Sequence, residues 1–519
     1  MISAYTGTAV RRAEAPLLAA GQGGELMQRA AYGLYAATAS RLGARRGRIY
    51  GARVVVLAGS GNNGGDALFA AARLLGRGAA ATAVLTSAHA HPEALAAFQT
   101  AGGTTVSLTQ DNAAALAGGA LAADAVLDGV LGTGGSGGLR GPVRDLAEAL
   151  NTARLQGRSP LVVACDLPSG VDADSGRTGG TCLRADLTVT FGAVKTGLLA
   201  GPGAVAAGEI HCVDIGLGPY LGSPDAYRLQ AEDLAELIPL PAAQDHKYSR
   251  GVLGIAAGSD TYPGAALMAA GAALATGVGM VRYLGPESVA RLINLAHPEA
   301  VCGTGSVPQT HVQAWLAGPG AGNDADQRRR AEDAMASGLP AAIDADAIGA
   351  VRPGLHPGVV LTPHAGELSA LLGSLGEDAE RAQIEADPLR YARLAAARTG
   401  ATVLLKGWAT VAAAPTGEVY SQADATPWLA TAGSGDTLSG ILGALLATDR
   451  TPEDARGPGH YARLAAAAAH LHGRAGALAA ADGPVQPSQL GPRIQALVAE
   501  LTRQGSTRIQ VRSMSEVKK

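Results

Sequence analysis

Short β-branched runs alternate with alanine- and leucine-rich segments along the first half of the chain. The apolar runs predict strands at residues 53–58, 82–85, 104–108, 125–128, 161–166 and 187–191. The segments between them predict helices, for example at 66–75 and 146–155, and residues 1–50 are expected to be helical as well. Such alternation is typical of βαβ units, so we expect a parallel sheet in a Rossmann-like, three-layer α/β domain.

The same alternation resumes in the second half of the chain. Strands are predicted at 252–257, 280–284, 312–317, 341–344, 359–362 and 403–406, followed by an antiparallel pair at 410–414 and 418–421. Helices are predicted at 265–275, 325–336, 366–372, 388–398, 436–447 and 461–480. Asp387 before Pro388 indicates a capped helix start with proline in the first turn. A second α/β domain follows from this pattern.

Residues 216–245 interrupt the alternation of strands and helices, because they contain four prolines and only a short acidic helix near 232–237. We place the domain boundary in this segment and predict domains at 1–222 and 223–503. Residues 504–519 are polar and basic and are expected to form a frayed tail.

Composition narrows the class of protein. A chain of 519 residues, 47% hydrophobic and 16% charged, fits two large globular domains. The net charge of −3 gives no reason to expect nucleic acid or a membrane as partner. No secretory signal is apparent, and the four cysteines form no CxxC pair, so we expect a cytoplasmic protein without a zinc site. The apolar stretch 265–281 is interpreted as a buried helix.

Lysine is rare, and this suggests where a compact ammonium is needed. The chain has 41 basic residues, but lysine occurs only at 195, 247, 406, 518 and 519. Lysine and arginine differ mainly at specific anion contacts, so the three lysines in the body of the protein are candidates for such contacts. The alternative is that lysine occurs at any of these positions by chance and has no functional role there.

The first candidate site begins at Gly59–Asp66, which follows the strand 53–58 and opens a helix. Glycines allow a phosphate to approach the backbone, and a helix N-terminus offers it free N–H groups. The run differs from both the GxGxxG and the Walker A patterns. The alternative is a tight turn in which Asp66 caps the helix.

Two further loops are expected at the same edge of the sheet. Asp128–Gly134 and Asp166–Asp172 each place an aspartate just past the end of a strand. Three such loops with oxygen ligands could bind a hard cation and leave one carboxylate for chemistry. Each loop taken alone could instead be an Asx-turn.

The second candidate site is the glycine-rich segment Thr431–Gly440. The amides of Gly433–Gly435 could form an anion hole, with Asp436 at the start of a helix. Transfer of a phosphoryl group to an alcohol needs such donors together with a carboxylate that takes the hydroxyl proton. A plain helix cap by Asp436 is the alternative. In the loop 361–367, His364 starts a helix and Glu367 is placed for a cap or a metal-linked role, although His364 could also be purely structural.

Residues 1–220 resemble the NAD(P)H-hydrate epimerase family, because NNGGD at 62–66, DGVLGTG at 128–134 and DLPSGVD at 166–172 occur in the family's order. The resemblance implies a potassium ion bound by Asn63, Asp128 and Ser169, and it makes Asp166 the acid/base. The implied substrate-binding residues are Asn62, Asn63, Gly64, Gly65, Asp66, Gly132, Thr133, Gly134, Gly135, Ser136, Gly137, Gly138 and Asp166. Ala67 departs from the family, which often has glycine there. Lys195 matches a family lysine, with no role implied.

Residues 235–500 resemble the ADP- or ATP-dependent NAD(P)H-hydrate dehydratase family, which has a ribokinase-like α/β fold. The motifs in family order are HKYSRG, YPGA, GPGAG, DADAI, LTPHAGE, KGWAT and GSGD. The implied hydrate-binding residues are Ala265, Gly320, Gly322, His364 and Asp436. The implied nucleotide-binding residues are Lys406, Gly407, Trp408, Ala409, Thr410 and Gly435. ADP would phosphorylate the hydrate hydroxyl with Mg²⁺ on the phosphates, and loss of phosphate would give NAD(P)H.

Together these resemblances predict a bifunctional metabolite-repair enzyme, both isomerase and lyase. Its substrates would be hydrated NADH or NADPH and ADP, and we expect a homo-oligomer. Two alternatives stay open at this point. One is a vitamin or sugar kinase of the ribokinase type fused to a non-catalytic nucleotide-binding module, because such kinases share the GSGD loop. The other makes the first half a scaffold.

Overall fold

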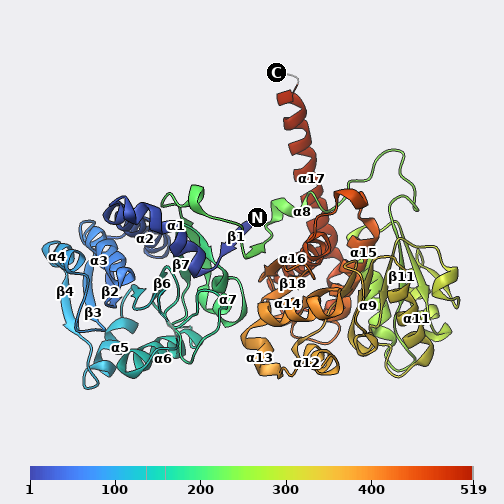
Figure 1. The fold of residues 1–519 in the computed structure, drawn as a ribbon, viewed down its shortest axis with the longest axis horizontal. Coiled ribbons are helices and arrows are strands. Elements are labelled where there is room, and N and C mark those ends of the chain that lie inside the picture. The colour runs from blue at the N-terminus through green and yellow to red at the C-terminus, as the bar shows by residue number, and fades with distance from the viewer. Residues whose placement is uncertain (136, 158, 517–519) are drawn as a thin grey trace. The chain divides into compact units, whose positions relative to one another are not determined.

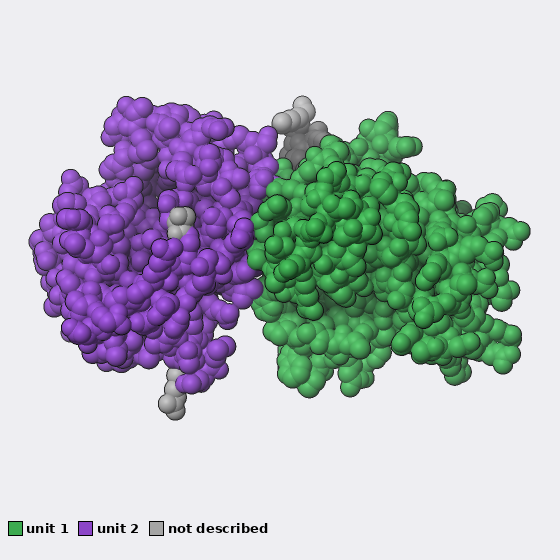
Figure 2. Space-filling view, turned by 60° about the horizontal axis from the view of Figure 1, so that its bottom comes forward, with its two compact units in different colours: residues 1–2, 226–519 green, residues 3–225 purple. Residues whose placement is uncertain are grey.

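The computed structural model describes residues 1–135, 137–157 and 159–516, which form two compact units. One unit is Ser3–Asp225, and the other starts at Ala226 and includes Met1–Ile2. Figure 2 shows the two units in different colours. The units divide at Asp225, whereas the domain limits at 222 and 503 stay predictions.

The first unit contains a parallel sheet with the strand order β4-β3-β2-β5-β6-β7-β9. Its strands are β2 (Arg53–Ala58), β3 (Ala80–Leu85), β4 (Thr104–Ser107), β5 (Ala125–Gly129), β6 (Leu161–Cys165), β7 (Leu187–Phe191) and β9 (Glu209–Val213). The six predicted strands are confirmed. The edge strand β9 was missed because its side chains are mostly exposed and give no apolar run. A short strand β1 (Ile2–Tyr5) also pairs in parallel with β8 (Val194–Lys195).

Helices cover both faces of this sheet, as Figure 1 shows. They are α1 (Gly7–Ala19), α2 (Gly23–Arg46), α3 (Asn62–Leu75), α4 (Pro92–Thr100), α5 (Ala113–Leu121), α6 (Gly141–Leu155) and α7 (Gly201–Ala207). Successive residues of a strand point to opposite faces. Val54 and Val56 therefore join the core beneath α2 and α3, while Leu57 joins the core beneath α5 and α6. The three-layer α/β prediction is confirmed.

The strand order of this sheet reverses at one point, between β2 and β5. From β2 the chain moves through β3 and β4 to one edge, and from β5 through β6 and β7 to the other. Ligands of open α/β sheets bind where the order reverses, at the carboxyl ends of the strands. The loops after β2 and β5 flank that point, and both belong to the first candidate site.

The second unit is built on a longer sheet with the order β13-β12-β11-β14-β15-β16-β17-β18-β19-β10. Its strands are β10 (Ala226–Arg228), β11 (Val252–Ala256), β12 (Met280–Leu284), β13 (Val301–Gly303), β14 (Ala314–Ala317), β15 (Ala341–Ile343), β16 (Val359–Leu361), β17 (Thr402–Leu405), β18 (Thr410–Ala413) and β19 (Val419–Gln422). The predicted antiparallel pair is confirmed as β18 and β19. The order reverses between β11 and β14, and the loops after these strands flank that point, where ligands of open α/β sheets bind.

Helices also cover this sheet (Figure 1). They are α8 (Ala231–Leu234), α9 (Pro263–Thr276), α10 (Glu287–Ala296), α11 (Ala325–Ala336), α12 (Ala365–Ser374), α13 (Arg381–Ala386), α14 (Pro388–Thr399), α15 (Ser434–Thr448), α16 (His460–Ala480) and α17 (Gly491–Glu516). The apolar stretch from 265 is the buried helix α9, as predicted. Helix α15 packs so closely on α9 that a β-carbon at Gly440 would lie 2.3 Å from the Ala269 carbonyl oxygen. The α/β prediction for the second half is confirmed, and Asp387 caps α14.

Three local predictions were wrong. Helix α3 begins at Asn62, so NNGGD forms the first turns of the helix instead of a loop before it. Residues 1–50 include the strand β1 before their helices. The expected frayed tail instead continues helix α17 to Glu516, because polar residues such as Gln, Arg and Glu are good helix formers and no proline ends the helix. In the described part of the chain, no helix is both long and apolar enough to cross a membrane.

Candidate active sites

Asp166 stands at the centre of the first candidate site, directly after β6. Its backbone is in the left-handed region, with φ at 68°, and its N–H donates to the Val189 carbonyl of β7 at 2.8 Å. Residues other than glycine rarely adopt this conformation, and such strain is concentrated at functional sites. The backbone therefore turns the Asp166 side chain away from the regular course of the strand.

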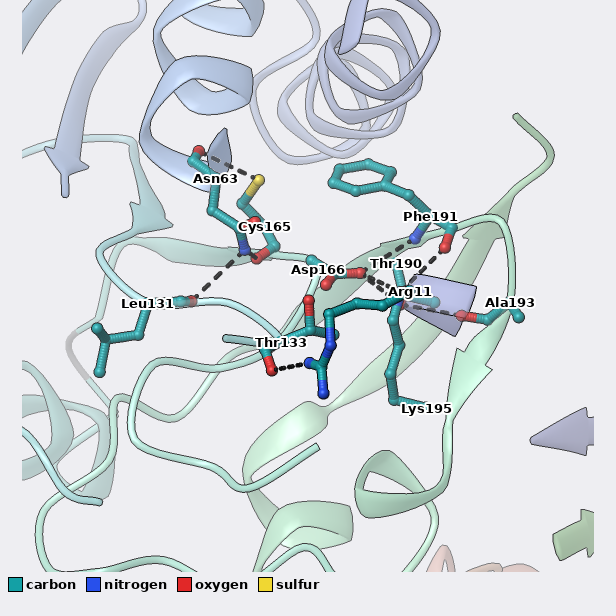
Figure 3. A network of polar contacts seen from close by, with 10 residues as sticks. All are labelled: Arg11, Asn63, Leu131, Thr133, Cys165, Asp166, Thr190, Phe191, Ala193 and Lys195. Carbon is teal, nitrogen blue, oxygen red and sulfur yellow. Dashed lines mark hydrogen bonds and ion pairs between the residues drawn. The ribbon is translucent and has the colours of Figure 1, made fainter. Parts of the chain in front are cut away.

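Lys195 forms a buried ion pair with Asp166 (Figure 3). The ammonium lies 2.5 Å from Asp166 Oδ1, and it also donates to the Thr190 hydroxyl at 3.1 Å and to the Phe191 carbonyl at 2.9 Å. The Thr190 hydroxyl donates to the same Asp166 oxygen at 3.0 Å. The scarcity of lysine had pointed to Lys195, and the structure now gives it a partner.

Two more acids, Asp66 and Glu14, interact electrostatically with this pair, and the sequence analysis missed Glu14. Asp66 on α3 is 5% exposed, and its Oδ1 is buried without a hydrogen-bond partner among the described residues. Burial, and then repulsion from Asp166 and Glu14, raise the pKa of Asp66 well above its usual value. Burial also raises the pKa of Glu14 on α1, while Lys195 lowers it. Helix α1 carries no recognisable motif, so only the tertiary structure brings Glu14 to the site.

Helix α1 also reaches the glycine-rich loop after β5. The Arg11 guanidinium donates to the Thr133 carbonyl oxygen at 2.8 Å (Figure 3). Thr133 and its glycine neighbours were predicted to bind the substrate, and Ser136 of that set lies outside the described residues. Arg11 is therefore a second contribution of α1 that the sequence analysis did not identify.

Two of the residues predicted to bind potassium, Asn63 and Ser169, lie at the backbone of Leu131, and the third, Asp128, is bonded to Ser169. Ser169 donates from its hydroxyl to Asp128 Oδ1 at 2.6 Å and from its N–H to Asp128 Oδ2 at 2.8 Å. The Asn63 amide nitrogen lies 3.5 Å from the Leu131 carbonyl oxygen, and the Ser169 hydroxyl lies 3.4 Å from the same atom. Burial raises the pKa of Asp128 to about 6, against the hydrogen bonds from Ser169 that lower it.

Glycine is required here by contacts within the chain. A β-carbon at Gly132 would lie 2.3 Å from the Asn63 amide nitrogen, and one at Gly64 would lie 2.2 Å from the Gly59 carbonyl oxygen. Real β-carbons cannot approach other atoms so closely. Close packing of the loops therefore accounts for these two glycines independently of any approach by a phosphate.

The second candidate site has its own lysine, Lys406, which is partly buried. Lys406 Nζ lies 2.8 Å from Asp344 Oδ1 and 3.8 Å from Glu367, and the Ser439 hydroxyl donates to Asp344 Oδ2 at 2.7 Å. Burial opposes the charge on Lys406, but Asp344 and Glu367 outweigh it and raise the pKa of Lys406. Asp344 directly follows β15 and Lys406 directly follows β17, so both residues lie at the carboxyl-end edge of the sheet.

Asp436 and the glycine loop face this pair. A β-carbon at Gly435 would lie 3.5 Å from Lys406 Nζ, which places the ammonium beside the start of α15. Burial and repulsion from Asp344 raise the pKa of Asp436 to about 6, although Lys406 lowers it. No side-chain cap bond was found at the start of α15, where Gly433 is the cap residue, so Asp436 is not the helix cap.

His364 is the cap of α12, as its alternative interpretation suggested. Its Nδ1 accepts from the N–H groups of Gly366 at 3.0 Å and Glu367 at 3.1 Å, and Glu367 accepts from the His364 N–H at 2.7 Å. The His364 side chain is nevertheless 58% exposed, and its Nε2 is not used in the cap. His364 also forms a backbone bridge with Lys406.

The remaining predicted residues fall into two groups. A β-carbon at Gly320 would lie 2.7 Å from the Ala265 β-carbon, and Gly322 donates from its N–H to Asp346 at 2.7 Å, so these residues line the loops after β11 and β14. The segment Lys406–Thr410 follows β17, with Ala409 buried and Trp408 exposed. Among the described residues, no three histidine, cysteine or acidic side chains gather as metal ligands.

Fold and comparisons define an α/β enzyme of two units, and each unit has a lysine–aspartate pair beside a glycine-rich helix start. A family model described as YjeF-related protein N-terminus matches residues 23–197, and one described as NAD(P)H-hydrate dehydratase matches residues 253–495. The chain belongs to the family of bifunctional NAD(P)H-hydrate repair enzymes, as the following relatives show.

The bifunctional NAD(P)H-hydrate repair enzyme Nnr of Mycobacterium leprae is 42% identical over 512 residues, covering 96% of this chain and 99% of the relative. The enzyme of the same name from Mycobacterium tuberculosis H37Rv is 43% identical, covering 86% of this chain and 89% of the relative. A solved ADP/ATP-dependent NAD(P)H-hydrate dehydratase from Bacillus subtilis, co-crystallised with ATP and Mg²⁺, is 26% identical with a TM-score of 0.48, covering 53% of this chain and 99% of that structure. The relatives match both halves of the chain, which removes the kinase-plus-module alternative.

Proposed function

We propose that this chain restores hydrated NADH and NADPH in two steps. The first unit interconverts the R and S hydrates, and the second dehydrates the S hydrate with ADP, yielding NAD(P)H, AMP and phosphate. The observation that carries the proposal is the presence of two separate lysine–aspartate sites in a chain whose relatives are bifunctional repair enzymes.

At the first site, Asp166 is the acid/base. Inversion of the hydrate requires a proton to move at the hydroxyl on the ring carbon next to nitrogen, and a positioned carboxylate can move it. The buried Lys195 ammonium fixes the Asp166 side chain in place. The substrate would lie along Asn62–Asp66 and the loop 132–138, where Arg11 holds Thr133.

The donor set around Leu131 suits potassium. One carboxylate and neutral oxygens favour a weakly charged ion, since divalent ions usually recruit several carboxylates. Asp128, Ser169 and the amide oxygen of Asn63 would hold it, while the Asn63 amide nitrogen donates to the Cys165 carbonyl at 2.7 Å. A bound potassium ion would offset the negative charge of the buried carboxylate beside the dinucleotide phosphates.

At the second site, Asp436 is the general base. The hydrate hydroxyl attacks the terminal phosphoryl group of ADP and gives its proton to Asp436, and AMP leaves. The amides of the loop 433–435 and the Lys406 ammonium face the transferred group and stabilise its charge. Phosphate then leaves the ring carbon while the adjacent carbon loses a proton, which restores the ring double bond.

Magnesium is expected to bind mainly through the phosphates of the nucleotide and not through a set of protein ligands. Mg²⁺ commonly keeps several waters and binds through substrate phosphates and one or two carboxylates, so the absence of a three-ligand cluster among the described residues fits it. When bound, it would offset the charge on the phosphates of ADP. A cytoplasmic location and a homo-oligomeric state remain predictions.

One experiment tests the proposal directly. The purified chain is incubated with ADP and either the R or the S hydrate of NADH, and the absorbance of regenerated NADH is followed. Both epimers should be consumed, and consumption should depend on ADP. Failure to consume the S hydrate would reject the assignment of the second unit.

We expect Asp128→Ala to weaken dinucleotide binding at the first site without unfolding it. The side chain is fully buried but holds the Ser169 loop instead of packing in the core. Binding would be measured by titration in potassium and in a large organic cation, with thermal unfolding as the fold check. Equal affinity in both salts for the wild type would reject the potassium site, as would a crystal grown in potassium without an ion within roughly 3 Å of these oxygens.

We expect Asp344→Asn to shift the pH dependence of dehydration. Activity of a general base falls as it becomes protonated, so kcat should decline below about pH 6 in the wild type. Repulsion from Asp344 raises the pKa of Asp436, and loss of that charge also frees Lys406 to attract Asp436. Both effects lower the pKa of Asp436, so the acid limb should move to lower pH.

Ser439→Ala is the matched control, because it removes a hydrogen bond to Asp344 but keeps the Asp344 charge. Its acid limb should stay where the wild type has it. An unchanged limb in Asp344→Asn would contradict the coupling between Asp344 and Asp436.

A further inference from the structure

Asp66 is a buried acid of the first site to which no role in the reaction has been given so far. Its carboxyl is on α3, is almost fully buried, and has an oxygen without a hydrogen-bond partner among the described residues. Gly65 beside it packs against the His91 ring, and nothing in the fold uses the Asp66 carboxyl as a helix cap. A buried polar atom without a partner is costly unless a ligand supplies one.

The environment of Asp66 differs from that of Asp166. Asp166 accepts from the Lys195 ammonium at 2.5 Å, from the Thr190 hydroxyl at 3.0 Å and from the Phe191 N–H at 3.3 Å. These donors fix the orientation of the Asp166 side chain. Asp66 has no such ammonium, and the ionisable groups that act on it are the acids Asp166 and Glu14.

Two carboxyls with opposite environments can divide acid and base roles between them. Burial and the two neighbouring acids raise the pKa of Asp66 well above its usual value, so a neutral carboxyl can persist there at higher pH than in water. Enzymes assign the proton donor to the carboxyl that is held neutral and the base to the one that is held ionised.

We propose that Asp66 is the second catalytic group of the epimerase, the acid that donates a proton to the departing hydroxyl while Asp166 serves as the base. This inference rests on the proposed function of the first unit and adds a residue to it. Glu14 on α1 is a positioning residue that keeps Asp66 in its neutral form.

The step balances with water alone. The bond between the ring carbon and the hydroxyl oxygen breaks, the Asp66 proton goes to that oxygen, and water leaves. The ring nitrogen lone pair forms the carbon–nitrogen double bond of an iminium ion. Solvent water then adds to the other face of this carbon and gives a proton to Asp166. The net change is one proton moved from Asp66 to Asp166, and exchange with solvent resets both groups. The reverse conversion uses the same groups in exchanged roles.

The test uses Asp66→Asn in the full-length protein. Interconversion of the purified R and S hydrates is measured by chromatographic separation without ADP, after subtraction of the enzyme-free rate. Loss of a general acid should lower kcat by about 10²–10⁴. Consumption of the S hydrate with ADP should stay at the wild-type rate, because the second unit has its own site. The amide has the size of the neutral carboxyl and carries no charge, so the variant should unfold at about the same temperature as the wild type.

The pH profile separates a chemical role from a structural one. Wild-type interconversion should decline at high pH as Asp66 loses its proton, and this descending limb should be absent from the residual activity of Asp66→Asn. Glu14→Gln removes a charge that raises the pKa of Asp66, so its descending limb should move to lower pH. Groups near Asp66 whose titration must be considered are Asp166, Glu14, Cys165 and His91.

The outcomes separate the proposed epimerase function of the first unit from the proposed role of Asp66. If the wild type does not accelerate interconversion, the proposed function of the first unit is wrong. If the wild type is active and Asp66→Asn retains its rate, or retains the descending limb, Asp66 is not the acid. An unchanged limb in Glu14→Gln would remove Glu14 from the scheme while leaving Asp66 in it.

Discussion

Replacement of Asp436 by asparagine is expected to abolish ADP-dependent dehydration while leaving epimerisation intact. Asp436 lies at the start of α15 beside the glycine loop, and burial together with Asp344 raises its pKa to about 6, close to the pH at which a base works best. The amide cannot take the hydroxyl proton, so kcat should fall by about 10²–10⁴. The rate of NADH formation from the S hydrate and ADP measures the effect.

The control for this prediction is Asp326→Asn, which makes the same change on the exposed surface of α11. It should have wild-type activity on both epimers. Near-normal turnover by Asp436→Asn would remove Asp436 from the mechanism. A variant that loses both dehydration and ADP binding would instead indicate that Asp436 holds the nucleotide.

Replacement of Asp166 by asparagine is expected to block use of the R hydrate and spare the S hydrate. Asp166 is the group in the first unit that combines a strained backbone, a buried ammonium partner and a position at the end of β6. Without its carboxylate, the R hydrate can reach the second site only through uncatalysed interconversion. With ADP in excess, R consumption should fall by about 10²–10⁴ while S consumption stays unchanged.

This variant needs a stability check, because it leaves Lys195 buried without its anionic partner. Breaking a buried ion pair by removing one partner typically costs about 3–5 kcal/mol. The double variant Asp166→Asn with Lys195→Met removes both charges and should recover part of the lost thermal stability without recovering activity. Asp145→Asn on the surface of α6 is the matched control with the same chemical change. If both epimers are consumed at wild-type rates by Asp166→Asn, the first unit is a scaffold.

The amino-acid sequence by itself determined most of the fold. The strands 53–58, 187–191 and 280–284 were predicted with the bounds that the structure has, because buried parallel strands are continuous apolar runs that depend little on their neighbours. Strands β9 and β13 at the sheet edges were missed, since their exposed residues leave no such run. The start of α3 was misplaced because the glycines of NNGGD are poor helix formers in isolation. Only the tertiary structure packs Gly64 against Gly59 and Gly65 against His91.

The sequence also identified the strand-end aspartates, because the carboxyl ends of parallel strands must meet at one edge. Only the tertiary structure decided what surrounds them. Lys195 and Asp166 are separated along the chain but form an ion pair in the folded protein. Glu14 comes from helix α1, which contains no recognisable motif. Which carboxyl carries a proton depends on burial and on neighbouring charges, and these are properties of the folded arrangement that no local pattern records. The division of Asp66 and Asp166 into acid and base is therefore a consequence of the fold, whereas their presence at the site follows from the sequence.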